Sequence, residues 1–280
     1  MTDIKRLIKL TADELSRSDA PEFEAYELVK HVFGLSKTDI LLNPVRELNE
    51  DKISRFNELV SKRRSGYPLQ YILGEWDFYG FTFKVREGVL IPRNETEQIA
   101  DEACRFLKNK KDAVVFDLCS GSGCIGLSVA ANNPGCRVYL FDISPEALDC
   151  SETNRGLLSL DNVRILDYDI FSGLDKHALP APDVILSNPP YVTEQEFSTL
   201  EAEIFHEPKR AIVAEGDGLG FYRCLCGKWL PYLKKGGFFM FESGEGQPEE
   251  IIKMISGDFT AETQNDMYGV CRFVSGIRRS

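Results

Sequence analysis

Apolar residues recur at helical spacing through the first seventy residues of the chain, as at Ile4, Leu7 and Ile8. The pattern predicts four short helices, at residues 4–15, 21–34, 38–42 and 51–64. Pro21 and Gly34 stand near the start and at the end of the second helix, where proline and glycine are favoured. Residues 1–70 are therefore predicted to form a small helical bundle that serves as a packing or docking module.

The pattern changes after Leu69, where an aromatic and β-branched segment runs from Gln70 to Val85. Gly80 divides this segment into two extended runs, which predicts a β-hairpin. We interpret residues 71–93 as a β-hairpin connector between two domains.

From residue 94 to the end of the chain, predicted helices and strands alternate. Helices are expected at 95–108, 124–132, 145–157, 194–204, 218–232 and 248–255. Strands are expected at 113–118, 137–141, 163–167, 183–187 and 237–242, with a final pair within 258–274. This alternation predicts an α/β domain over residues 94–280, with a mostly parallel seven-stranded sheet and helices on both faces. Ligands of such sheets bind outside the carboxyl ends of the strands, at the topological switch point.

The composition is that of a soluble globular protein, because 43% of the 280 residues are hydrophobic and 28% are charged. No segment approaches the roughly 18 uninterrupted apolar residues of a membrane span, and the first residues lack the apolar core of a signal peptide. The eight cysteines stand mostly singly, and the three histidines, His31, His177 and His206, are scattered. We therefore expect a cytoplasmic protein with reduced thiols and no bound metal.

The net charge of −11 is unevenly distributed along the chain. Residues 1–70 carry 12 Lys and Arg against 12 Asp and Glu, whereas residues 71–280 carry 21 against 32. Enzymes that act on nucleic acids gain much of their affinity by neutralising phosphates with basic side chains. The acidic balance of the second part therefore favours a protein or a small molecule as substrate.

A loop rich in small residues follows the first strand of the α/β region. The strand and loop read Asp117-Leu118-Cys119-Ser120-Gly121-Ser122-Gly123, and a helix follows. Gly121 and Gly123 let a ligand approach the backbone because they carry no Cβ atom, and a helix N-terminus lies next to them. Such a loop could serve a nicotinamide or flavin enzyme, and a purely structural tight turn can have the same sequence.

Carboxylates follow the next two strands. Asp142 comes about 20 residues after the glycine loop, where a carboxylate can accept hydrogen bonds from both ribose hydroxyls of a bound nucleoside. A helix cap is an alternative role for this region, because Ser144 follows at a helix start. Asp169 could accept the exocyclic amine of adenine, with Ile170 and Phe171 against the base, or could simply form a turn at the strand end.

The fourth strand ends in the sequence Asn188-Pro189-Pro190-Tyr191. Two consecutive prolines remove two backbone donors and leave carbonyls that only accept. The Asn188 side-chain oxygen and the Pro189 carbonyl could hold both hydrogens of a planar amide or amine nitrogen, beside the aromatic wall of Tyr191. Holding both hydrogens turns the nitrogen lone pair towards a methyl donor, so catalysis comes from positioning and from acceptors placed where positive charge develops. A sulfonium methyl group is already activated, so neither a metal nor a strong general base is required.

Together these motifs resemble the Asn-Pro-Pro-Tyr branch of the class I, Rossmann-like S-adenosylmethionine-dependent methyltransferases. Further segments are similar to those of peptide chain release factor glutamine methyltransferases, namely 68–72, 74–76, 78–80, 91–93, 95–97, 206–208 and 241–244. The resemblance covers nearly the whole chain, including the helical N-terminal region.

This resemblance implies methyl transfer from S-adenosyl-L-methionine, leaving S-adenosyl-L-homocysteine. The implied acceptor is the glutamine side-chain amide in the Gly-Gly-Gln loop of class 1 release factors, which the helical N-terminal domain helps to dock. By matching positions, the implied donor site comprises Cys119, Ser120, Gly121, Ser122, Gly123, Asp142, Asp169, Ile170 and Asn188. The implied glutamine site comprises Asn188, Pro189, Pro190 and Tyr191, with Asn188, Pro189 and Tyr191 as its catalytic residues. We expect a monomer without direct contacts to nucleic acid or membrane.

Two positions depart from the family pattern. The donor loop usually begins with glycine where this chain has Cys119, and the motif before the next helix usually has proline where this chain has Asn94. A cysteine at the first loop position must point away from the donor, or the loop must shift. The sequence assigns no role to Glu207 or Glu242, either of which could line the pocket or be structural.

Two other functions fit parts of the sequence. A nucleic-acid adenine amino-methyltransferase also uses the Asn-Pro-Pro-Tyr motif, but base flipping requires a surface that grips the strand. We interpret the short basic segment at residues 62–64 as a solvated helix end, which does not supply one. A non-catalytic binding module of the same fold would be expected to lose the donor loop or Asn188, and both are intact.

Overall fold

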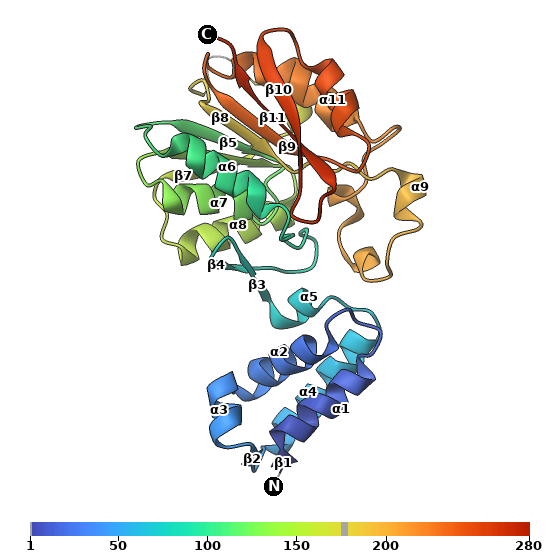
Figure 1. Cartoon of the computed structure of the whole chain (residues 1–280). Helices are drawn as coiled ribbons and strands as arrows, with labels where there is room; N and C mark the ends of the chain where they lie inside the picture. Colours follow the sequence, from blue (N-terminus) through green and yellow to red (C-terminus); the bar gives the residue numbers. More distant parts are fainter. Residues whose placement is uncertain (1, 175–178) are drawn as a thin grey trace. The chain divides into compact units, whose positions relative to one another are not determined.

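The computed structural model of the chain describes residues 2–174 and 179–280, so His177 lies outside the described residues (Figure 1). The chain forms two compact units. Unit 1 comprises Met1–Gly74 and Glu201–His206, and unit 2 comprises Glu75–Leu200 and Glu207–Ser280.

Unit 1 is a bundle of short helices. They are α1 (Ile4–Glu14), α2 (Pro21–Phe33), α3 (Lys37–Leu42), α4 (Glu50–Arg64) and α5 (Leu69–Leu73), with the short antiparallel strands β1 (Thr2–Asp3) and β2 (Val45–Arg46). Local sequence sets the helix ends. Asp3 caps α1 by accepting from Lys5 N and Arg6 N, and Gly34 ends α2 in the left-handed conformation. The four helices predicted within residues 1–70 are confirmed.

The prediction of an extended run from Gln70 is wrong, because Leu69–Leu73 form α5. Gly74 ends this helix with a φ of +73°, and its N–H donates to Gln70 O at 2.8 Å. A five-residue segment with four apolar residues has too little periodicity to separate a helix from a strand. The predicted hairpin is confirmed over a shorter range, as β3 (Glu75–Phe78) and β4 (Phe81–Lys84).

Arg63 is a buried ion-pair partner in unit 1. Its Nε and Nη2 donate to the two carboxylate oxygens of Glu24 at 2.8 and 2.7 Å, and Nη2 lies 3.1 Å from Glu203 Oε2. The interpretation of residues 62–64 as a solvated helix end is therefore wrong for Arg63. The helical period explains the difference, because Arg63 lies four positions after the buried Leu59 and shares its face of α4.

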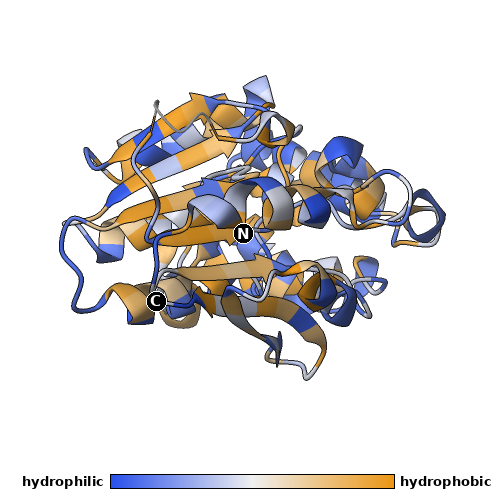
Figure 2. Cartoon of the chain, turned by 90° about the horizontal axis from the view of Figure 1, so that it is seen from above, coloured by the Kyte–Doolittle hydropathy of each residue, from blue (hydrophilic) through white to orange (hydrophobic). Residues whose placement is uncertain are grey.

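Unit 2 is built around a seven-stranded sheet. Its strands are β5 (Val114–Leu118), β6 (Arg137–Asp142), β7 (Val163–Asp167), β8 (Val184–Ser187), β9 (Phe238–Glu242), β10 (Phe259–Asn265) and β11 (Cys271–Arg278). The strand order is β10-β11-β9-β8-β5-β6-β7, and β11 alone runs antiparallel to its neighbours. The predicted mostly parallel sheet is confirmed. Figure 2 shows the hydrophobic residues concentrated in these strands.

Helices cover both faces of the sheet. On one face, α6 (Glu97–Leu107) and α7 (Cys124–Asn132) pack with the β3–β4 hairpin, and α8 (Pro145–Leu157) lies beside α7. On the other face lie α10 (Gly220–Cys224), which continues as a π-helix and a 3-10 turn to Tyr232, and α11 (Pro248–Met254). The described residues contain no helix that is long and apolar enough to span a membrane. All eight cysteines are free thiols.

The predicted helix at 194–204 is wrong beyond Phe197, where α9 (Glu194–Phe197) ends. The side chains of Ser198 and Thr199 bond to backbone carbonyls at Gln195 and Glu196. Such local hydroxyl bonds compete with the helical pattern.

The sheet order creates the place for a site. The chain passes from β5 outward to β6 and β7 on one side, and returns to β8 and β9 on the other. The carboxyl ends of β5 and β8 are therefore neighbours at the topological switch point, where ligands of such sheets bind.

Candidate active site

A pocket in unit 2 lies at the carboxyl ends of β5, β6 and β8. The predicted residues that line it are Cys119, Ser120, Gly121, Ser122, Asp142, Asp169, Ile170, Asn188 and Pro190. Three predicted site residues, Gly123, Pro189 and Tyr191, are not among its lining residues. The fold thus brings together residues that are separated by up to 71 positions in the printed sequence.

The donor loop, residues 119–123, turns sharply at the end of β5. Gly121 and Gly123 both have left-handed φ angles, +56° and +79°. A Cβ atom on Gly121 would meet nothing within 4 Å, whereas one on Gly123 would lie 2.9 Å from Leu127 Cδ1. Gly121 therefore leaves the backbone open to a ligand, and Gly123 allows α7 to pack closely.

Cys119 occupies the loop position where the family usually has glycine. Its φ of +60° lies in the left-handed region, which is strained for a residue with a Cβ atom. The side chain packs against the apolar cluster on the α10 face of the sheet. Burial raises the pKa of the Cys119 thiol well above its usual value, and the carboxylates of Asp142 and Asp117 raise it further. The loop keeps its turn, and the cysteine remains a neutral thiol.

Asp142 is held by two backbone donors. Gly121 N–H donates to Oδ2 at 2.8 Å, and Ser144 N–H donates to Oδ1 at 2.9 Å. Burial raises the pKa of the Asp142 carboxyl, and these two hydrogen bonds oppose the rise. Each carboxylate oxygen keeps acceptor capacity beyond its one protein donor, so this group can still accept hydroxyl groups from a ligand.

Apolar side chains form the far part of the pocket. Asp169 Oδ1 accepts from Phe171 N–H at 2.8 Å and so starts the 3-10 turn Ile170–Ser172. The ring of Phe171 meets that of Phe221 edge-on, with centroids 5.0 Å apart. Ile143 and Phe171 are exposed large apolar residues, and both line the pocket. These walls suit a planar aromatic group.

A buried chain of hydrogen bonds leads away from Asn188. Asn188 Nδ2 donates to Thr96 Oγ1 at 3.3 Å, and Thr96 Oγ1 donates to Glu242 Oε2 at 2.6 Å. Tyr191 OH donates to Glu242 Oε1 at 3.5 Å. Burial raises the pKa of the Glu242 carboxyl to about 7. The sequence assigned no role to Glu242 and missed Thr96, although both stand in segments that resemble the family.

Asp117 is a second buried carboxyl that the sequence reasoning missed. Its Oδ2 accepts from Gly126 N–H at 2.9 Å, while Oδ1 has no hydrogen-bond partner among the described residues. Burial raises the pKa of Asp117 to about 7, and the nearby Asp142 adds to the rise. The available signal was an acidic residue within the otherwise apolar strand 114–118.

Glu207 supports one wall of the pocket. It accepts from Ile91 N–H at 2.9 Å and pairs with the Arg93 guanidinium, and both of these residues line the pocket. Arg210, three positions later, also lines the pocket and pairs with Glu146 at the start of α8. Ion pairs thus link segment 207–211 to segment 88–93 and to the start of α8, beside the pocket.

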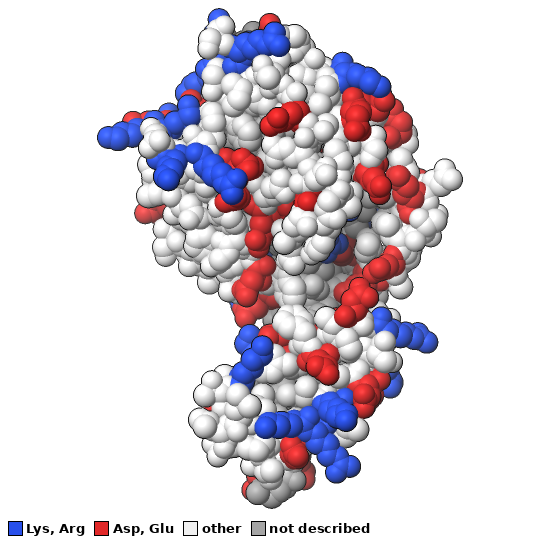
Figure 3. All heavy atoms as spheres, in the orientation of Figure 1, with Lys and Arg blue, Asp and Glu red and all other residues white. Residues whose placement is uncertain are grey.

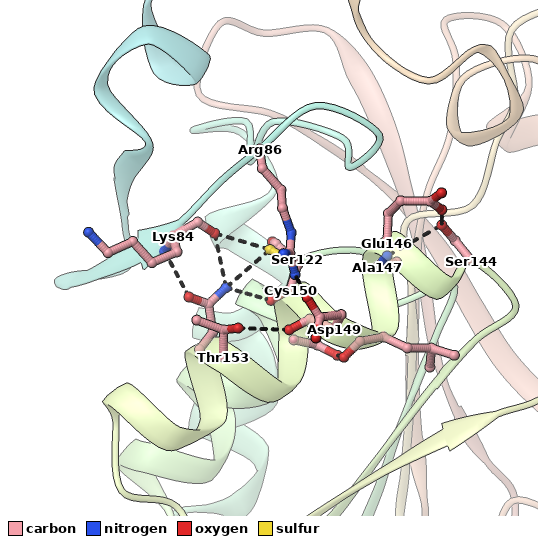
Figure 4. Close-up of polar contacts among 12 residues, drawn as sticks. Lys84, Arg86, Ser122, Ser144, Glu146, Ala147, Asp149, Cys150 and Thr153 are labelled. Atoms are coloured by element: carbon pink, nitrogen blue, oxygen red, sulfur yellow. Dashed lines mark hydrogen bonds and ion pairs between the residues drawn. The ribbon is translucent and has the colours of Figure 1, made fainter.

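Asn154 on α8 joins the β3–β4 hairpin to the donor loop. Its Oδ1 accepts from Lys84 N–H at 2.7 Å, and its Nδ2 donates to Ser122 O at 3.0 Å and to Lys84 O at 3.1 Å. Figure 4 labels Lys84, Ser122 and Cys150 in this region and marks hydrogen bonds among the residues drawn with dashed lines. The side chain is buried with all of its polar atoms bonded, so it holds the loop from behind.

Comparison with known proteins identifies the family. Residues 6–74 match the model of the PrmC N-terminal domain, and residues 97–219 match that of the methyltransferase small domain. The release factor glutamine methyltransferase of Thermodesulfovibrio yellowstonii is 34% identical over 89% of this chain and 90% of its own length. That of Fusobacterium nucleatum is 34% identical over 84% of this chain, which spans 66% of the relative. A ribosomal protein L11 methylase of Lactobacillus delbrueckii shares the fold, with a TM-score of 0.50 and 15% identity over 70% of this chain and 84% of that one. Unit 2 thus has the class I methyltransferase fold, and the chain belongs to the release factor glutamine methyltransferase family.

Proposed function

We propose that this enzyme transfers the methyl group of S-adenosyl-L-methionine to the side-chain amide nitrogen of the glutamine in the Gly-Gly-Gln motif of class 1 peptide chain release factors. The observation that carries the proposal is the pocket of unit 2, in which the donor loop and Asn188 line one cavity. The relatives are named release factor glutamine methyltransferases, which supports a release factor glutamine as the group that is methylated.

The pocket fits the methyl donor. Ser120 lines the pocket, and its buried Oγ has no hydrogen-bond partner among the described residues. This hydroxyl would be available to a polar group of the donor. Asp142 would accept the ribose hydroxyls, and Asp169 with the wall at Ile170 and Phe171 would hold the base. When bound, S-adenosyl-L-methionine supplies an activated sulfonium methyl group and leaves as S-adenosyl-L-homocysteine.

The acceptor nitrogen would be held by Asn188 and Pro189. Asn188 Nδ2 already donates to Thr96 Oγ1, so Oδ1 is the part of the amide left to accept from a substrate N–H. The Pro189 carbonyl would accept the second hydrogen, and Tyr191 would close the site. An amide nitrogen is a poor nucleophile, so two acceptors that stabilise its developing positive charge lower the barrier.

The substrate is a protein, and we propose that the helical residues 1–70 dock it. On the face drawn in Figure 3, unit 2 carries both kinds of charged side chain, with basic ones mainly towards the top and upper left and acidic ones over the middle and right. A mixed surface of this kind supports a protein partner over a nucleic acid, whose phosphates attract basic strips. We further propose that the enzyme acts as a monomer in the cytoplasm, where release factors work.

Transfer of labelled methyl groups tests the proposal. Purified protein is incubated with labelled S-adenosyl-L-methionine and a release factor that carries either Gly-Gly-Gln or Gly-Gly-Ala. Label on the first protein alone is the expected result, and label on both would contradict the glutamine assignment.

A variant then tests the site. Asn188→Ala is expected to lose methyl transfer by at least a hundredfold, with the calorimetric affinity for the donor changed less than threefold. Wild-type turnover in this variant would show that Asn188 is not the hydrogen-bond acceptor for the substrate amide.

A further inference from the structure

We infer that Thr96 and Glu242 fix the orientation of the Asn188 side-chain amide, so that Oδ1 faces the substrate. The site thereby selects a substrate amide nitrogen over a carboxylate. This inference rests on the proposed function, and it concerns two residues that act through Asn188. Thr96 precedes α6 and Glu242 ends β9, so the fold holds them on separate elements.

The direction of each hydrogen bond follows from the Glu242 carboxylate, which stands at the end of the series. An ionised carboxylate only accepts, so the Thr96 hydroxyl must donate its single proton to Glu242. With that proton committed, Thr96 Oγ1 can only accept. Asn188 must therefore turn its NH₂ group towards Thr96, at 3.3 Å, and its oxygen towards the substrate.

The opposite orientation would change the chemistry of the site. If Thr96 were free to donate, Asn188 Oδ1 could accept from it, and the NH₂ group would face the substrate. A pocket that presents N–H groups binds the oxygens of a carboxylate, whereas a pocket that presents an oxygen binds amide hydrogens. Glutamine and glutamate have nearly the same shape, so this orientation is what distinguishes them.

The surrounding residues bury the hydrogen bonds that link Asn188, Thr96 and Glu242, and they help to fix the direction of donation. Thr96, which also lines the pocket, is 2% exposed and Glu242 is 1% exposed, so the hydrogen bond between their side chains is buried. The Glu242 side chain also accepts from Tyr191 OH, and its backbone oxygen accepts from Tyr222 OH at 2.7 Å. A buried hydroxyl 2.6 Å from an ionised carboxylate donates to it, so the direction of this hydrogen bond is defined.

The orientation depends on the charge of Glu242. Burial raises the pKa of this carboxyl to about 7, with Glu95 raising it, and the Thr96 hydrogen bond, Arg272 and Arg93 lowering it. Tyr191, a neutral phenol whose own pKa is raised by burial, faces it as well. A protonated Glu242 can donate to Thr96 and release the hydroxyl proton for Asn188 Oδ1. Methyl transfer is therefore expected to fall as the pH drops through about 7.

The test compares Thr96→Val with Thr96→Ser and, as a matched control, with Thr153→Val on the exposed face of α8. Each full-length variant is assayed with release factors that carry Gly-Gly-Gln or Gly-Gly-Glu, and kcat, KM, the donor Kd and the affinity for each release factor are measured. Thr96→Val is expected to lower kcat/KM on Gly-Gly-Gln at least tenfold and to narrow the binding preference for Gln over Glu. Its donor Kd is expected to stay within twofold, and Thr96→Ser is expected to recover most of the loss.

The outcomes separate this inference from the proposed function. Absence of wild-type transfer to Gly-Gly-Gln overturns the function. Wild-type transfer with an unaltered Thr96→Val variant, or with a Thr96→Ser variant as impaired as valine, overturns only the role of Thr96.

Glu242→Gln provides the second measurement if Thr96→Val fails to fold. This variant removes the titrating group, so its kcat is expected to be lower than that of the wild type at pH 8 and flat between pH 6 and 8. The exposed Glu249→Gln serves as its control and is expected to keep the wild-type pH profile. A pH step through about 7 that persists in Glu242→Gln overturns the inference.

Discussion

The backbone N–H of Gly121 donates to Asp142 Oδ2 at 2.8 Å, which ties the donor loop after β5 to the carboxyl end of β6. The other oxygen of the same carboxylate accepts from Ser144 N–H at the start of α8. The Asp142 side chain thus hydrogen-bonds both to the donor loop and to Ser144, the residue that caps α8. The two functions that the sequence left open for this position, ligand acceptor and helix-start partner, are compatible in one geometry.

Replacing Asp142 with asparagine is expected to weaken donor binding at least tenfold. Asparagine has one acceptor oxygen, so its NH₂ group must face either the Gly121 or the Ser144 N–H, and two donors then oppose each other. Isothermal titration with S-adenosyl-L-methionine measures the change. Asp149→Asn on exposed α8 is the control, and a donor Kd unchanged by the Asp142 variant would remove this carboxylate from the site.

Substitutions at Cys119 are expected to reverse the usual order of alanine and glycine. At most positions glycine is less stable than alanine because it loses more conformational entropy. At a φ of +60°, the Cβ atom of alanine retains the left-handed strain and glycine does not. Cys119→Gly should therefore have a free energy of unfolding about 1 kcal/mol above that of Cys119→Ala. Urea denaturation measures both, and equal or inverted stabilities would show that the cysteine is unstrained.

Glu207→Gln is expected to loosen the pocket wall. The substitution leaves the Arg93 guanidinium, one third exposed, without its carboxylate, and Ile91 N–H keeps at best a neutral acceptor. The expected loss of stability is about 1–3 kcal/mol, at the lower end because solvent partly screens Arg93. Donor affinity should fall as well, since residues 88–93 line the pocket. A double-mutant cycle with Arg93→Met isolates the pair, and a coupling energy of zero would contradict the role of Glu207 in supporting the wall.

The fold could largely be predicted because the period of the apolar residues differs between strands and helices. The parallel order of β5 to β9 follows from their alternation with helices, and the structure confirms it. The short helix α5 could not be separated from a strand, since its five residues complete little more than one turn. The burial of Arg63 also escaped prediction, because its partner Glu24 lies 39 positions earlier in the chain.

The predicted residues of the methyl-donor site either adjoin one another, as at 119–123, or directly follow a strand. The order of strands in the sequence therefore places most of them near the switch point. Thr96, Asp117 and Glu242 belong to the same region by tertiary packing. Thr96 and Glu242 are 146 positions apart and meet only because β9 and the start of α6 lie together. The sequence alone assigned these three residues no role, because only the folded chain shows which donor faces which acceptor.

The stability of the protein is expected to fall as the pH rises from about 4 to about 7, and Asp117 is a principal cause. Burial raises the pKa of this carboxyl to about 7, so the native state holds a proton that the unfolded state releases near pH 4. The native state binds more protons in this window, and its free energy of unfolding therefore decreases with rising pH until Asp117 ionises at about 7. Asp117→Asn, which is neutral throughout, should gain on the order of 4 kcal/mol relative to the wild type across the window. Urea denaturation at intervals from pH 4 to pH 8 measures the difference, with Glu242→Gln as a comparison because Glu242 has a similarly raised pKa. A stability difference between wild type and Asp117→Asn that does not vary with pH would show that Asp117 ionises alike in the folded and unfolded states.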